Sequence, residues 1–141
     1  MKHIVLAAAL SLPAPLFAQS VCAMGGAPVE PAFETAKSAF LSGNFDAFAR
    51  ATTVLMPKGP AAFGDSMQRL KELFPEGFEG CQTVAQRRDA GGMVQEVTTF
   101  NIAGALGPMS LYLLAAPLRG EMKISYVYFN TTMNDVFDRL R

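Results

Sequence analysis

The sequence contains very little histidine and no tryptophan. Its single histidine is His3, close to the start of a chain of 141 residues and inside a segment that we expect to be removed. Without imidazole, the mature chain cannot build Ser-His-Asp or Cys-His catalytic machinery, or a zinc or iron site that uses histidine. The lack of tryptophan excludes a tryptophan-lined cage for sugars or cations. We therefore expect no metal site and no cofactor.

The chain also lacks an excess of charge of either sign. The chain has twelve Lys and Arg residues and twelve Asp and Glu residues. Loss of Lys2 with the signal peptide leaves eleven basic and twelve acidic residues. A nucleic-acid-binding surface needs a clear excess of positive charge, so we expect no nucleic-acid partner. The uncharged stretch Val97–Leu118 is interrupted by glycines and prolines. It therefore favours buried strands over a membrane span in the mature chain.

The first eighteen residues have the features of a bacterial-style signal peptide. Lys2 gives a basic start, Ile4–Leu12 is a short apolar run, and Ala18 is a small residue at the cleavage position. The apolar run is shorter than the roughly 20 residues that span a bilayer. We therefore predict a signal peptide over 1–18 and a periplasmic or secreted mature protein. Cleavage after Ala23 is the alternative.

The chain has only two cysteines, Cys22 and Cys81. In an oxidising compartment, an even pair of this kind typically forms a disulfide. Cleavage after Ala18 keeps both cysteines, whereas cleavage after Ala23 removes Cys22 and leaves Cys81 unpaired. We predict that cleavage follows Ala18 and that Cys22 and Cys81 form a disulfide.

The mature chain divides into an arm over residues 19–31 and one domain over 32–141. The arm is rich in Gly, Pro and small residues. Phe33 and Phe40 follow it at helical spacing, Gly43 predicts a stop, and Asn44 can cap a second helix. A third helical segment is expected over about 61–74.

From Cys81 onward the apolar pattern changes to a period of two, which is typical of strands. We predict strands over 81–88, 93–102, 109–116 and 122–131, and a short last helix after Thr132. The expected fold is α+β: two or three N-terminal helices packed on a four-stranded antiparallel meander, with a short C-terminal helix.

Two segments carry a resemblance to a known superfamily. The helical hairpin around Gly43-Asn44-Phe45, within 36–48, resembles the opening of NTF2-like (cystatin-like α+β roll) domains, and 123–131 resembles their closing strand. The resemblance implies a sheet curved around a helix, with a cone-shaped pocket. Such domains serve as isomerases, dehydratases, ligand carriers or interaction modules, so the resemblance does not imply one activity. The His-Asp pair of several of these enzymes has no counterpart here.

Glu96 is the candidate catalytic residue. It shares a face of its predicted strand with Val94, Thr98 and Phe100, which places a carboxylate among apolar side chains. Burial raises the pKa of a carboxylic acid and suits it to general acid or base chemistry. Two alternatives are structural: a bulge that turns Glu96 outward, or an ion pair with an Arg on a neighbouring strand.

Aromatic residues of the strands are the candidate ligand-binding residues. Tyr126 and Tyr128 are expected to share a face of their strand with Ile124 and to offer hydroxyl groups to a ligand. Tyr112 on the adjacent strand is a third candidate of the same kind. Phe100 belongs to a set of phenylalanines that could line an apolar cavity. The alternative is that the three tyrosines are ordinary half-buried strand residues whose hydroxyl groups reach solvent.

Three functional hypotheses follow. The first is non-catalytic binding of a small apolar ligand or a protein partner, which the missing histidine and metal ligands favour. The second is a small lyase or isomerase that uses Glu96 as a general base and Tyr112 or Tyr126 to polarise the substrate. The third is a structural or assembly subunit with an apolar patch around the last helix. The sequence leaves open whether the protein forms a homodimer.

Overall fold

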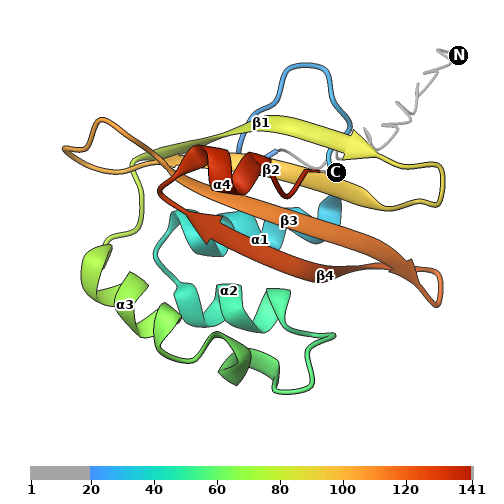
Figure 1. Ribbon diagram of the computed structural model, residues 1–141, viewed down its shortest axis with the longest axis horizontal. Helices are drawn as coiled ribbons and strands as arrows, with labels where there is room; N and C mark the ends of the chain where they lie inside the picture. The colour runs from blue at the N-terminus through green and yellow to red at the C-terminus, as the bar shows by residue number, and fades with distance from the viewer. Residues whose placement is uncertain (1–19, 141) are drawn as a thin grey trace, which may run out of the picture.

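The computed structural model describes residues 20–140, and the predicted signal peptide over 1–18 lies outside this range. Figure 1 shows helices and strands in the predicted order. The elements are α1 (Pro31–Leu41), α2 (Phe45–Thr52), the 3₁₀-helix η1 (Gly59–Phe63), α3 (Asp65–Leu73), β1 (Gly80–Arg88), β2 (Val94–Asn101), β3 (Met109–Leu118), β4 (Glu121–Asn130) and α4 (Met133–Phe137).

The first two helices form the predicted hairpin. Glu30 precedes α1 and its side chain accepts a hydrogen bond from the Ala32 amide at 3.4 Å, while Pro31 occupies the first turn. Asn44 caps α2 as predicted, because its side-chain oxygen accepts a hydrogen bond from the Ala47 amide at 3.1 Å. The turn between the helices passes through Gly43 at φ +72°, where a side chain would be strained.

The third helical segment is divided rather than continuous. Gly64 adopts φ +50° and ψ −128°, which no residue of a right-handed helix has, and it separates η1 from α3. Met67 and Leu70 of α3 are buried against the rest of the domain, as their spacing predicts.

The four strands form one antiparallel sheet in the order β1-β2-β3-β4. The predicted α+β class is therefore confirmed: helices precede a four-stranded antiparallel meander, and a short helix follows it. Central strand β2 is buried at seven consecutive positions, 94–100, because both of its faces are covered.

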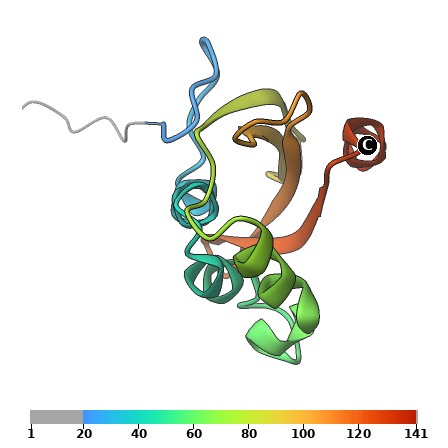
Figure 2. The same cartoon turned by 90° about the vertical axis from the view of Figure 1, so that its left-hand side faces the viewer.

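Different helices pack on the two faces of the sheet. In Figure 2 the curved sheet lies between α1–α3 on one side and α4 on the other. We call the side of α1–α3 the inner face and the side of α4 the outer face. The outer face has a small core of its own, in which Val136 of α4 is buried against Val97 and Tyr112.

Phenylalanine fills the space between the inner face and the helices. Phe40 lies at the centre, fully buried. Its ring centroid lies between 4.7 and 5.9 Å from those of five other phenylalanines, namely Phe45, Phe48, Phe78, Phe100 and Phe129. Aromatic side chains of this size bury large areas, so this cluster contributes strongly to hydrophobic stabilisation.

A register shift in the last pair of strands changes which β4 residues share a face. Ala115 pairs with Ile124, but the preceding residue Leu114 pairs with Tyr126, so Ser125 is an extra residue in β4. Ile124 belongs to the inner core, whereas the tyrosines beyond the bulge lie on the outer face. The expectation that Tyr126 shares a face with Ile124 is therefore wrong, because strict alternation fails at the bulge.

None of the helices within residues 20–140 combines the length and the apolar character needed to cross a membrane.

Candidate functional site

Lys37 and Glu96 form an ion pair between α1 and β2. Lys37 Nζ lies 2.6 Å from Glu96 Oε1, and each side chain is only 2% exposed. Lys37 reaches this position because it lies one helical turn after Phe33 on the buried stripe of α1. A second carboxylate, Glu34 on the same helix, has its Oε1 2.6 Å from the same ammonium nitrogen.

The Glu96 carboxylate also receives several hydrogen bonds. Thr83 Oγ1 and Thr98 Oγ1 donate to Oε1 at 3.0 and 3.3 Å, and Gln86 Nε2 donates to Oε2 at 3.1 Å. An ammonium group and three neutral donors therefore compensate one buried charge, as buried carboxylates require. This network holds Glu96 in place and engages both of its oxygens.

The sequence placed Glu96 on the core-facing side of its strand, and the structure confirms this position. Of the two structural alternatives, the outward bulge is wrong, since Glu96 pairs regularly with Gln86 and Leu113. An ion pair does form, but its cation is the helical Lys37 rather than an Arg on a neighbouring strand.

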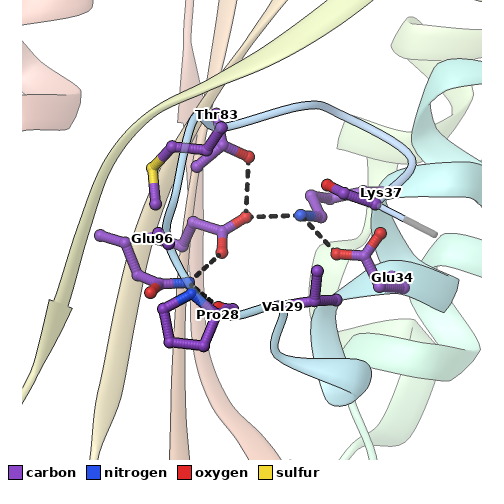
Figure 3. Close-up of a pocket in the computed structure, with 10 residues that line it drawn as sticks. Pro28, Val29, Glu34, Lys37, Thr83 and Glu96 are labelled. Carbon is purple, nitrogen blue, oxygen red and sulfur yellow. Dashed lines mark hydrogen bonds and ion pairs between the residues drawn. The ribbon is translucent and has the colours of Figure 1, made fainter. Parts of the chain in front are cut away.

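The space beside this ion pair is small, and the arm forms part of its wall. A cavity of about 20 Å³ is lined by Glu34, Lys37, Thr83, Gln86 and Glu96 on one side, and by the arm on the other. Figure 3 shows Pro28 and Val29 of the arm next to Lys37, Glu34 and Glu96. A cavity of this size holds about one water molecule and no substrate.

The predicted disulfide ties the arm to this region. Cys22 and Cys81 are bonded, with their Cα atoms 5.0 Å apart and the two residues 59 positions apart in sequence. Cys22 is fully buried and belongs to the inner core, while Cys81 at the start of β1 is partly exposed.

The three tyrosines lie together on the outer face, away from Glu96 and Phe100. The Tyr112 and Tyr126 rings meet edge to face with centroids 5.9 Å apart. The Arg139 guanidinium lies 4.3 Å from the centroid of the Tyr128 ring, an arrangement that favours cation–π attraction. Phe100 is fully buried in the inner core. The structure therefore does not bring the candidate catalytic residue and the candidate tyrosines into one pocket.

The tyrosine hydroxyl groups already have protein partners. The Tyr112 hydroxyl donates to Gln95 Oε1 at 2.9 Å, and burial raises the pKa of Tyr112 above its usual value. Arg139 Nη1 donates to the Tyr126 hydroxyl at 3.4 Å, and Asn130 Nδ2 donates to the Tyr128 hydroxyl at 3.1 Å. The contacts of Arg139 with Tyr126 and Tyr128 attach the C-terminal segment to β4.

A different part of the surface carries an apolar groove. It lies between α3 and the ends of β3 and β4, has a volume of about 220 Å³, and is mainly apolar. Leu73 on its wall is 69% exposed, and the exposed Arg69 lies beside it with no ion-pair partner among residues 20–140. We call this hollow the α3 groove; its lining residues are Ser66, Arg69, Leu70, Leu73, Phe74, Met109, Phe129 and Thr131.

Sequence reasoning missed both Lys37 and the α3 groove, although each had a signal. Lys37 is four residues after Phe33 and three before Phe40, so helical periodicity alone places a cation on the buried face. Leu73 follows Leu70 by three residues but extends the apolar stripe beyond what the sheet covers. The sequence pattern predicts that α3 has an apolar face, but it does not show which part of that face the sheet leaves exposed.

Within residues 20–140, no group of three or more His, Cys, Asp or Glu side chains is arranged to hold a metal ion. Comparisons with protein-family models, curated protein sequences and solved structures found no significant match.

Proposed function

We propose that this protein is a non-catalytic binding module that receives an apolar side chain of a protein partner in the α3 groove. The observation that carries the proposal is a mainly apolar hollow of about 220 Å³ beside Leu73, a leucine that remains 69% exposed. Anchoring side chains of binding partners pack into apolar hollows of this kind.

The size of the groove favours a protein partner over a small ligand. Pockets that enclose drug-sized ligands have volumes of about 300–1,000 Å³, which is larger than the α3 groove. On the inner face, the region where an NTF2-like domain would have its cone-shaped pocket contains the phenylalanine cluster around Phe40. The groove suits one anchoring side chain of a larger partner.

The charge beside the groove indicates the chemistry of that partner. Arg69 is exposed on the groove wall, and a guanidinium group binds carboxylates through paired hydrogen bonds. The partner segment should therefore present an apolar residue next to an Asp, a Glu or a terminal carboxylate.

Catalysis by Glu96 is the weaker alternative. A general base must come within hydrogen-bond reach of the substrate proton. Glu96 is 2% exposed, and both of its carboxylate oxygens accept hydrogen bonds from protein groups. The cavity beside it is too small for a substrate.

We further propose that the protein works after export, in the periplasm or outside the cell, with the signal peptide over 1–18 removed after Ala18. The disulfide between Cys22 and Cys81 supports an oxidising compartment, since such bonds persist there. The order of helices and antiparallel meander supports, at the level of architecture, the resemblance to NTF2-like domains.

Selection from a displayed random-peptide library tests the binding proposal. Selected peptides should carry an apolar residue beside an acidic one, and Leu73→Ser and Arg69→Glu should each weaken their binding by about tenfold or more. Leu106→Ser is the matched control, because Leu106 is fully exposed and does not line the groove.

Two results would overturn the proposal. One is a set of peptides that bind the two groove variants as tightly as the unmodified protein. The other is a small molecule that remains bound to the purified mature protein in native mass spectrometry and is lost on Leu73→Ser, which would make the groove a small-ligand site.

A further inference from the structure

The arm over residues 20–30 covers the ion pair between Lys37 and Glu96. In Figure 2 the arm (blue) lies above α1, beside the strand at the edge of the sheet. Its residues Met24, Ala27, Pro28 and Val29 contribute the outer wall of the 20 Å³ cavity, and Figure 3 shows its backbone crossing beside the ion pair.

Noncovalent bonds hold the arm near its two ends, and at the second end Arg88 Nη1 lies 3.4 Å from Glu30 Oε2. The Val21 amide donates to Glu34 Oε2 at 2.7 Å. The Pro28 carbonyl accepts hydrogen bonds from Gln86 Nε2 at 3.0 Å and from Arg88 Nη2 at 2.9 Å. Between Ser20 and Glu30 the arm has no helix or strand, so no backbone ladder of its own keeps it closed.

The disulfide is the covalent attachment of the arm to the sheet. It joins Cys22, near the start of the arm, to Cys81 at the beginning of β1. The same strand carries Thr83 and Gln86, which donate to Glu96. One bond therefore fixes the arm directly beside the network that the arm covers.

We propose that the arm is a disulfide-locked lid, and that reduction of the bond between Cys22 and Cys81 opens it and gives Lys37 and Glu96 access to solvent. The opened site presents an ammonium group between two carboxylates, with Thr and Gln donors around them. This inference is independent of the α3 groove, which shares no lining residue with the covered cavity.

The redox step is a thiol–disulfide exchange with a dithiol. A thiolate of the dithiol attacks Cys81 Sγ, which is on the partly exposed side of the bond, and a mixed disulfide forms as the Cys22 thiolate leaves. The second thiol of the reagent displaces Cys81. Cys22 and Cys81 each end as a thiol with one proton, and the two electrons come from the dithiol, which is oxidised to its own disulfide.

Lysine acylation measures the opening directly. The mature protein is treated with N-hydroxysuccinimidyl acetate, with and without prior dithiothreitol, and acetylation of each lysine is followed by peptide mass spectrometry. Lys37 should be protected in the oxidised protein and should react at least about tenfold faster after reduction. The internal control is Lys71, which is 39% exposed and should react equally in both states.

A double variant and hydrogen exchange distinguish lid opening from general unfolding. The Cys22→Ser/Cys81→Ser protein should show the fast acetylation of Lys37 without any reductant. Amide protection of β2 and β3 should persist in that variant, because these strands form the centre of the sheet.

Three outcomes would overturn the proposal that the arm is a disulfide-locked lid. Lys37 could stay protected after mass spectrometry shows complete reduction, or it could already react as fast as Lys71 in the oxidised protein. Alternatively, protection of β2 and β3 could disappear together with that of Lys37, which would mean that the disulfide holds the whole fold rather than the arm.

Discussion

At the scale of single residues, the ion pair between Lys37 and Glu96 is buried, since each side chain is only 2% exposed. Taking two charges out of water is costly, and only good geometry and added hydrogen bonds offset that cost. Here the ammonium lies 2.6 Å from Glu96 Oε1, and Thr83, Thr98 and Gln86 satisfy the carboxylate further. Removing one partner alone is therefore far more damaging than removing both.

Lys37→Met should lower the free energy of unfolding by about 3–5 kcal/mol, because it leaves the Glu96 charge buried with only neutral donors. Urea denaturation monitored by circular dichroism measures the loss. The double variant Lys37→Met/Glu96→Leu should recover a large part of it, since an apolar pair has no charge to desolvate.

The matched control for this prediction is Lys71→Met. Lys71 lies 2.8 Å from Asp46 in an ion pair that is largely exposed, so its removal should change stability much less. Equal losses for the two lysine variants would mean that the buried pair has no special role in stability.

Tyr112 should make the stability of the domain depend on alkaline pH. Burial raises its pKa in the folded state above the ordinary value near 10. The folded state then favours the neutral phenol, so this contribution is fully present below the unfolded pKa and is lost as the pH rises through the raised folded pKa. Tyr112→Phe should remove this pH-dependent part of the unfolding free energy.

Urea denaturation at a series of pH values from about 8 to 11 checks the Tyr112 prediction. Tyr126→Phe is the second variant: the charge of Tyr126 adds to the raised pKa of Tyr112, so its removal should weaken the alkaline effect without abolishing it. If Tyr112→Phe keeps the full alkaline loss of stability, another group is responsible for it.

At the scale of the elements, the turn between α1 and α2 packs against the loop between α3 and β1 through two glycines. Gly43 adopts φ +72° and Gly77 adopts φ +76°. The Phe78 amide donates to the Leu41 carbonyl at 2.8 Å, which draws the loop onto the end of α1. Two backbones come this close only where neither residue has a side chain.

Gly77→Ala should destabilise the domain by about 1–3 kcal/mol more than Gly59→Ala. A Cβ at Gly77 would lie 2.2 Å from the Leu41 carbonyl oxygen, whereas a Cβ at Gly59 has no atom within 4 Å. Both glycines have positive φ, so the comparison isolates the clash from backbone strain. Thermal denaturation of the two variants measures the difference, and similar melting temperatures would contradict the prediction.

At the scale of the whole molecule, one sheet separates two cores, and the disulfide joins the arm to the larger one. Cys22 is buried among the residues of the inner core. In the chain-entropy account, a crosslink across 59 positions destabilises the unfolded ensemble by about 4 kcal/mol. The bond therefore contributes to global stability as well as to the position of the arm.

Reduction of the bond between Cys22 and Cys81 should lower the melting temperature of the mature protein. Differential scanning calorimetry with and without dithiothreitol measures the shift, and the mass of the sample confirms the redox state. Equal melting with and without reductant, for a sample whose mass confirms an intact bond beforehand, would count against a stabilising role.

Local patterns in the sequence were sufficient for the fold class and for the elements except the third helical segment, which is divided at Gly64. Helical spacing around Phe33 and Phe40, the cap at Asn44 and the change to a period of two after Cys81 predicted the helices and the four-stranded meander. They also placed Glu96 on the core-facing side of β2 and paired Cys22 with Cys81. These features depend on residues close together in the chain or on the number of cysteines, so the sequence alone is enough to predict them.

Only the tertiary structure decided which distant groups meet. The extra residue at Ser125 moved Tyr126 and Tyr128 to the outer face. The docking of α1 on the inner face brought the long Lys37 side chain to Glu96 of β2. The end of the sheet likewise left the α3 groove open beside Leu73. Strand register and helix docking depend on contacts between residues far apart in the chain, whereas periodicity gives only the face of an element on which a residue lies.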